Sequence, residues 1–235
     1  MDTTAGIVTV GNELLSGAVE NSNASWLARE LLACGIVPKL ILTLPDEVPA
    51  IARALREVAR AHPYVFVTGG LGPTPDDVTR EAVAEALERP LVEHPIMVQV
   101  LSHLYRAGPT PPVLAMARLP KGAELLSEDG RIFPGFLVEN LYVFPGIPEL
   151  MQANFALVKP TLKGTPFHSR SLTTALDETR YAELLAEAQA AFPEVLFGSY
   201  PKLKDGRFTA TVTLRSRDAK VLDEAWAWLT ARWPE

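Results

Sequence analysis

Buried-strand and amphipathic-helix patterns alternate along the first part of the chain, and this alternation constrains the fold more than any other feature. Three mostly apolar runs are typical of strands that are buried on both faces of a parallel sheet, and they cover residues 5–10, 39–44 and 64–67. Each run is followed by a segment with the apolar spacing of a helix. The alternation predicts a mostly parallel, doubly wound α/β sheet with right-handed crossovers.

The first two of these helices have residues typical of helix ends. Residues 21–23 contain Asn and Ser, which are common N-caps, and Gly35 suits the C′ position of the same helix. Asp46 is placed to open the second helix. Taken alone, Asp46 is best interpreted as the N-cap of that helix, a role for which Asp is among the preferred residues.

The third strand leads into a glycine-rich loop, which is the main candidate for a binding site. Residues 68–81 read Thr-Gly-Gly-Leu-Gly-Pro-Thr-Pro-Asp-Asp-Val-Thr-Arg-Glu. Thr74 is predicted to cap the next helix, with Pro75 at its first position and Asp77 as the acid of a capping box. A strand, a glycine loop and a helix N-terminus in this order present unpaired backbone N–H groups that suit phosphate. The loop has no Walker A ending, and Pro73 interrupts a G-x-G-x-x-G pattern.

Four acidic residues follow predicted strands, and we expect them at one edge of the sheet. The loops after parallel strands gather at the carboxyl edge, where ligands bind. The acids on these loops are Glu13, Asp46, Asp76 and Asp77, and Asn12 lies beside the first of them. Carboxylates near a phosphate suit a bridging divalent cation or the activation of water. The alternative is that Asp76 and Asp77 only favour the helix dipole and that Glu13 is only solvated.

Later elements extend the same sheet. Residues 136–138 and 141–144 are predicted to form neighbouring strands joined at Glu139-Asn140. Pro145 and Gly146 then leave the second strand and enter another helix, so they are expected at the same edge. A further helix is predicted over residues 94–105, with four inward apolar side chains: Met97, Val100, Leu101 and Leu104.

The order of predicted strands and helices changes after about residue 162, and this change predicts two domains, residues 1–162 and residues 163–235. The second has the order strand, helix, strand, strand, helix, which predicts a small α+β domain. Residues 208–214 alternate as a one-sided antiparallel strand does, and Asp205-Gly206 is a typical hairpin turn.

Composition limits the possible partners. The formal charge of −6 argues against a nucleic-acid partner, and the second domain has neither a Lys/Arg excess nor a Gly-x-x-Gly clamp. The sequence contains no apolar run long enough for a membrane span, and residues 1–4 lack the features of a signal peptide. Cys34 is the one cysteine, so there is no disulfide framework. We therefore expect a cytoplasmic protein without a membrane partner. A homo-oligomer, a dimer in the simplest case, is a separate expectation that composition does not test.

Three stretches together resemble a known family. Residues 11–17 (Gly-Asn-Glu-Leu-Leu-Ser-Gly), residues 21–24 (Asn-Ser-Asn-Ala) and residues 69–81 are similar to the CinA-like competence/damage-inducible proteins. The resemblance implies an N-terminal MoaB/MogA-like domain, an α/β/α sandwich of the molybdopterin-binding fold, and a KH-type second domain. The deamidase domain that many such proteins carry does not follow in this sequence, so deamidase activity is not expected.

The resemblance also implies an activity and a set of site residues. It implies a metal-dependent pyrophosphatase that hydrolyses ADP-ribose or a related nucleotide sugar to AMP and a sugar phosphate. Asp46 and Asp77 would be catalytic and, with Glu13, would hold Mg, Mn or Co. The residues expected to bind the substrate and its phosphates are Asn12, Gly69, Gly70, Gly72, Thr74, Pro145 and Gly146.

An alternative stays open, namely a module that binds molybdopterin or a nucleotide without turnover. Residues 113–117 and 128–135 depart from polar segments common in the family, which leaves the substrate open. Under either hypothesis the expected ligand is a small phosphorylated molecule of ADP-ribose or pterin type.

Overall fold

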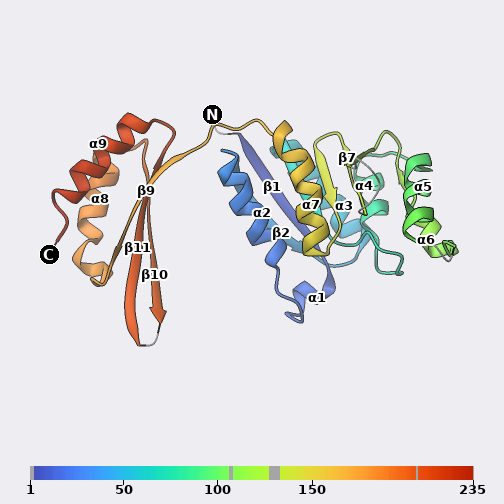
Figure 1. Cartoon of the computed structure of the whole chain (residues 1–235), viewed down its shortest axis with the longest axis horizontal. Helices are drawn as coiled ribbons and strands as arrows, with labels where there is room; N and C mark the ends of the chain where they lie inside the picture. The colour runs from blue at the N-terminus through green and yellow to red at the C-terminus, as the bar shows by residue number, and fades with distance from the viewer. Residues whose placement is uncertain (1–2, 106–107, 127–132, 205, 235) are drawn as a thin grey trace. The chain divides into compact units, whose positions relative to one another are not determined.

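The computed structural model describes residues 3–105, 108–126, 133–204 and 206–234, and all structural statements below concern these residues. The chain divides into two compact units, Met1–Gly164 and Thr165–Glu235 (Figure 1). Three predictions fall partly outside the described residues: the chain start at Met1 and Asp2, the departure at residues 128–132, and the hairpin turn at Asp205.

A mixed but mostly parallel sheet forms the centre of the first unit. Its strands, in the order of the sheet, are β2 (Val37–Leu44), β1 (Thr4–Val10), β3 (Tyr64–Thr68), β8 (Leu141–Phe144), β7 (Gly135–Val138) and β6 (Glu124–Leu126). The first four run parallel to one another, whereas β7 is antiparallel to both of its neighbours. A separate antiparallel pair is formed by β4 (Leu91–Glu93) and β5 (Arg118–Pro120).

Helices cover both faces of this sheet. Those of the first unit are α1 (Asn12–Leu15), α2 (Ser22–Ala33), α3 (Val48–Ala61), α4 (Thr79–Ala86), α5 (Pro95–Leu104), α6 (Pro111–Ala115) and α7 (Pro148–Val158), with a 3-10 turn η1 at Lys159–Thr161. Helices α3 and α4 cover one face, and α2 and α7 cover the other (Figure 1). Apolar side chains of each pair belong to the hydrophobic core on that face. The predicted mostly parallel α/β fold is therefore confirmed.

Several predicted local features are also present. Asn21 is the N-cap of α2, and its side chain accepts a hydrogen bond from the backbone N–H of Ala24. Gly35 follows the C-cap of that helix with a φ of 75°, in the left-handed region that favours glycine. The hairpin between β7 and β8 turns at Glu139 and Asn140, as expected.

Other local predictions are wrong. The helix after the glycine loop begins at Thr79 rather than at Pro75, because Thr74 and Asp77 close a separate turn before it. Glu47, not Asp46, is the N-cap of α3. Glu13 was expected on a loop, with Asn12 beside it, and both lie in the short helix α1. Leu104 was expected inward but is 37% exposed.

The second unit is a three-stranded antiparallel sheet with two helices, the predicted small α+β order. Its elements are β9 (His168–Thr174), η2 (Glu178–Arg180), α8 (Ala182–Ala191), β10 (Leu196–Lys204), β11 (Arg207–Ser216) and α9 (Ala219–Thr230). The strand order is β10-β11-β9. Its core, around Tyr181, Val212 and Leu222, belongs to this unit alone. No helix in the described parts of either unit is long and apolar enough to cross a membrane.

Candidate functional site

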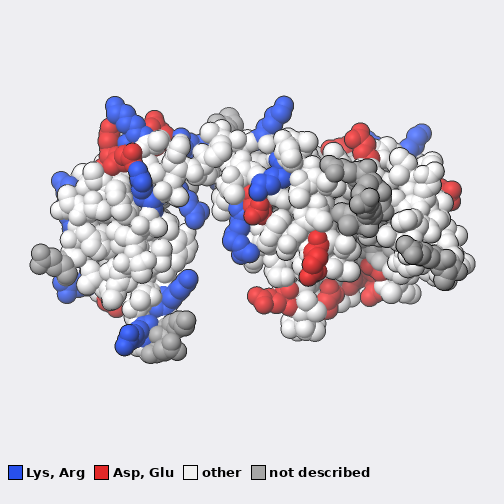
Figure 2. Space-filling model, viewed as in Figure 1, with Lys and Arg blue, Asp and Glu red and all other residues white. Residues whose placement is uncertain are grey.

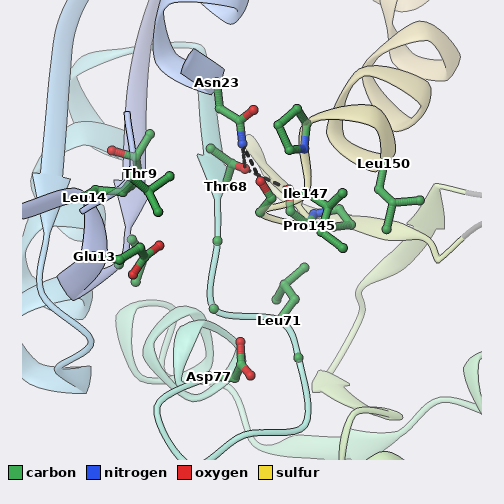
Figure 3. A pocket seen from close by; sticks show the side chains of 18 of the residues that line it. Thr9, Glu13, Leu14, Asn23, Thr68, Leu71, Asp77, Pro145, Ile147 and Leu150 are labelled. Carbon is green, nitrogen blue, oxygen red and sulfur yellow. Dashed lines mark hydrogen bonds between the residues drawn. The ribbon is translucent and has the colours of Figure 1, made fainter. Parts of the chain in front are cut away.

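A pocket of about 580 Å³ lies at the carboxyl edge of the parallel strands. The loops that follow β1, β2, β3 and β8 all contribute to its lining, through Gly11, Asp46, Gly69 and Pro145 among others. Figure 3 shows Glu13 on one side of the pocket, with Leu71, Ile147 and Leu150 on the side away from it. The pocket therefore forms where a doubly wound sheet is expected to bind its ligand.

The carbonyl groups of the glycine loop are all held from one side. Thr79 donates its hydroxyl to the carbonyl of Gly69, at 2.8 Å, and its backbone N–H to that of Gly70, at 3.1 Å. Arg80 donates to the carbonyls of Leu71, at 2.6 Å, and Gly72, at 3.2 Å. Four successive carbonyls thus face the first two residues of α4.

This arrangement directs three N–H groups the other way. In a planar trans peptide the C=O of one residue and the N–H of the next point in opposite directions. The N–H groups of Gly70, Leu71 and Gly72 therefore point away from α4, and they donate no hydrogen bond to any other described residue. All three residues line the pocket. The loop is a concave set of donors, of the kind that binds phosphate.

Positive φ values make this backbone path possible. Gly69 has a φ of 105° and Gly70 a φ of 66°, which are strained for any residue with a Cβ. A Cβ on Gly69 would collide with the carbonyl oxygen of Val10, and one on Gly70 with the side chain of Thr79. Glycine is required at both positions for conformation and for space.

Arg80 places a positive charge behind the loop. The residue is 5% exposed, and its guanidinium also donates to the carbonyl of Asp77. Burial lowers the pKa of Arg80, while the nearby charges of Glu81 and Asp77 raise it. An arginine remains protonated in proteins even so. Its charge therefore adds to the attraction that the loop exerts on an anion.

The opposite wall is fixed by two polar side chains. Asn23, near the start of α2, donates from Nδ2 to the carbonyl of Gly146 at 2.7 Å and to Thr68 Oγ1 at 3.2 Å. The buried hydroxyl of Thr68 donates in turn to the carbonyl of Pro145 at 2.8 Å. These bonds, drawn in Figure 3, tie α2 to the ends of β3 and β8.

The acidic residues come from three different loops. Glu13, Asp46, Asp76 and Asp77 all line the pocket. Figure 2 shows Asp and Glu side chains gathered at the end of this unit where α1 lies. Asp46 accepts the backbone N–H of Asn12 at 2.8 Å, so it caps the first turn of α1 rather than α3. Asp77 accepts the backbone N–H of Thr74 at 2.9 Å and its hydroxyl at 2.5 Å, as a capping-box acid would, although no helix begins there.

The carboxylates in the pocket suit a hard cation only if phosphate groups of a bound ligand complete its coordination. Carboxylate oxygens are the ligands that Mg²⁺ and Mn²⁺ prefer. Oδ1 of Asp46 and Oδ1 of Asp77 accept no hydrogen bond from the described part of the chain. The described residues contain no group of three or more His, Cys, Asp or Glu side chains that could hold a metal by themselves. Mg²⁺ is commonly held by one or two carboxylates together with substrate phosphates, and this set fits that pattern.

Most of the sequence-predicted site residues line the pocket, but two do not. Glu13, Asp46, Gly69, Gly70, Gly72, Asp77, Pro145 and Gly146 are in its lining. Asn12 and Thr74 are not; their backbone N–H groups instead orient Asp46 and Asp77.

Sequence reasoning gave no site role to four residues that shape the pocket: Asn23, Thr68, Thr79 and Arg80. All four lie in or next to the glycine-loop and Asn-Ser-Asn stretches. For Thr79 and Arg80, the available indication was a polar side chain a few residues after a predicted anion-binding loop; Asn23 and Thr68 had no comparable indication.

Comparison with known proteins supports the assignment of the fold. Residues 6–164 match the family described as "Probable molybdopterin binding domain", and residues 166–235 match "FAD synthase, middle domain". The second match does not confirm the KH type that was expected for the second unit.

Individual relatives agree with the first match. A protein from Archaeoglobus fulgidus is 36% identical over 196 residues, which cover 83% of this chain and 85% of the relative. A "putative competence-damage inducible protein" from Desulforudis audaxviator is 34% identical over 200 residues, covering 82% of this chain but 47% of that longer protein. The crystal structure of "the protein CinA with unknown function" from Thermoplasma acidophilum has a TM-score of 0.64 at 27% identity, covering 68% of this chain and 98% of that one. The chain belongs to the family of the probable molybdopterin binding domain.

Proposed function

We propose that the first unit binds the phosphate groups of a small ligand of nucleotide or pterin type in this pocket. The observation that carries the proposal is the set of three N–H groups at Gly70, Leu71 and Gly72 that donate to no other described residue, backed by the buried guanidinium of Arg80. A volume of about 580 Å³ is in the range of pockets for ligands of this size. The family description supports a pterin among the candidates.

We further propose that the chain hydrolyses a pyrophosphate linkage in ADP-ribose or a related nucleotide sugar. The hydroxyl of water would bond to one phosphorus while the bridging P–O bond to it breaks, and the remaining proton of water would go to the bridging oxygen, giving AMP and ribose 5-phosphate. Phosphates in the glycine loop would lie beside Asp46 and Asp77, where their negative charges repel unless a cation intervenes. A divalent cation bound there, Mg, Mn or Co, would neutralise developing charge on the phosphoryl oxygens.

Each of the pocket residues would have a separate role in this hydrolysis. The loop N–H groups would hold the phosphoryl group in place, and the buried Arg80 would stabilise its charge. Asp46 and Asp77 would hold the cation or orient the attacking water, and Glu13 would assist from α1. Thr74 and Asn12 would keep the two aspartates in position through their backbone N–H groups.

A second candidate function is binding without turnover. Both aspartates already accept hydrogen bonds from the backbone, which suits a structural role in shaping the loops.

Release of AMP separates the two functions. The purified chain should be incubated with ADP-ribose, with and without Mg²⁺, Mn²⁺ or Co²⁺, and AMP measured by chromatography. Hydrolysis predicts release that requires the metal and that falls roughly 10²-fold or more in Asp77→Asn. Asparagine keeps an oxygen that can accept from Thr74, so the melting temperature should hardly change.

Two results would contradict the proposed hydrolysis or the role of Asp77 in it. Full activity in Asp77→Asn would refute the catalytic role of Asp77. Binding of ADP-ribose without any AMP in the wild type would support the binding module. Light scattering on the same sample would test the expectation that the chain forms a dimer.

A further inference from the structure

The lining of the pocket includes apolar residues to which phosphate binding assigns no role. Four of them come neither from the glycine loop nor from the other loops at the carboxyl edge, and we call them the apolar wall: Leu104, Tyr105, Met116 and Phe133. They come from the end of α5, the end of α6 and the segment before β7. None of them carries a charge, in contrast to the acidic loops at the carboxyl edge.

Two members of this wall are exposed although they are large. Leu104 is 37% exposed and Tyr105 is 38% exposed, and Ile147, which also lines the pocket, is 57% exposed. Large apolar groups left in contact with water around one concavity are typical of a binding site. Their burial by a ligand would be favourable at roughly 25 cal/mol per Å² of apolar surface.

The base of the wall is packed against buried side chains. Met116 is 2% exposed and packs with Met97, Leu101 and Val113, and Phe133 packs against the same cluster. The carbonyl of Phe133 accepts a hydrogen bond at 3.0 Å from the fully buried side chain of Asn154. A surface that is fixed before the ligand arrives loses little entropy on binding.

We propose that the apolar wall binds the planar heteroaromatic ring of the ligand, and that Tyr105 determines the preference for ligands that carry such a ring. The proposal rests on the proposed function, in which the glycine loop holds the phosphates. A pyrophosphate alone would leave most of a pocket of about 580 Å³ unfilled. The apolar and aromatic side chains of the wall offer contacts to a ring face, and stacking on an aromatic side chain is strong and tolerant of ring type.

The test compares ligands with and without a ring. Titration calorimetry would measure binding of AMP, ribose 5-phosphate and inorganic pyrophosphate to the wild type and to variants of the full chain. Tyr105→Leu keeps apolar bulk but removes the aromatic face, so AMP should bind about 10-fold more weakly, while the two ringless ligands should bind as before. Tyr105→Phe should restore AMP binding to within about twofold of the wild type, since stacking needs the ring.

Ile96→Ala is the matched control. Ile96 lies on the same helix α5 and is 55% exposed, but it does not line the pocket. This variant should bind all three ligands as the wild type does, and melting curves should show that every variant is folded.

The outcomes separate this inference from the proposed function. If the wild type binds pyrophosphate and AMP but Tyr105→Leu leaves AMP binding unchanged, the ring site is refuted and phosphate binding stands. If Tyr105→Leu weakens all three ligands equally, Tyr105 does not recognise a ring and the inference is also wrong. If the wild type binds none of the three, the phosphate site itself is refuted and the ring site with it.

Discussion

Single residues decide which groups the glycine loop presents to the pocket. Thr79 and Arg80 bind the carbonyls, and the trans peptide geometry then leaves the N–H groups facing the ligand side. Gly70 is central to this arrangement, because its φ of 66° turns the chain and a Cβ at this position would collide with the Thr79 side chain. The position therefore carries two separate requirements, one for conformation and one for space.

Gly70→Ala and Gly17→Ala together separate these two requirements. Gly17 has a similar φ of 75° but nothing within 4 Å of an added Cβ. Gly17→Ala should lower the free energy of unfolding by about 1 kcal/mol through backbone strain alone. Gly70→Ala adds a collision with Thr79, so the loss should be about 2–4 kcal/mol, and phosphate binding should weaken with it. Urea denaturation would measure both; equal losses for the two variants would show that the Thr79 contact does not matter.

At the scale of elements, the glycine loop and α4 are coupled, because the first two residues of α4 hydrogen-bond to the carbonyls of the loop. The helix begins later than predicted because Asp77 closes a turn on Thr74, and this delay brings Thr79 and Arg80 beneath the loop. A helix that began at Pro75 would place residues 79 and 80 within its second turn, where the backbone N–H of Thr79 would bond inside the helix instead of to Gly70. The observed start therefore positions the loop.

Arg80→Lys tests this coupling. Lysine keeps the charge but cannot reach several carbonyls with a planar fork, so buried acceptors on Leu71, Gly72 and Asp77 would lose partners. The free energy of unfolding should fall by about 2–4 kcal/mol, and phosphate affinity should fall as well. Arg56→Lys is the control, because Arg56 pairs with Glu85 at a half-exposed site and should cost less than about 0.5 kcal/mol. Similar melting temperatures for the two variants would contradict the role of Arg80.

The elements could be predicted from sequence to different degrees. Buried parallel strands such as β1 and β3 were predictable because a short, continuous run of β-branched and aromatic residues is typical of a strand covered on both faces. The short elements α1 and β4 were not, since three or four residues carry no clear periodicity. Asp77 was expected to bond back to Thr74 and does so, yet the helix itself starts elsewhere, because a local hydrogen bond does not by itself propagate a helix.

For the whole molecule, the fold explains why residues distant in sequence meet in one pocket. Parallel strands β1, β2, β3 and β8 end at one edge, so the sequence pattern alone could indicate that Glu13, Asp46 and Asp77 would lie there. It could not indicate the apolar wall. Tyr105 and Met116 reach the pocket from α5 and α6, which lie outside the repeating strand and helix units. Contacts between such additions and the sheet depend on tertiary packing, which no local pattern encodes.

The central claim is that phosphate binds to the backbone N–H groups of the glycine loop, and amide NMR tests it most directly. Titrating the ¹⁵N-labelled full chain with AMP should shift the amide signals of Gly70, Leu71 and Gly72 most strongly, because these N–H groups would gain an acceptor. The amides of residues 168–230 in the second unit should stay nearly unchanged and serve as an internal control. Shifts that leave the three loop amides unaffected and cluster in the second unit instead would contradict the account.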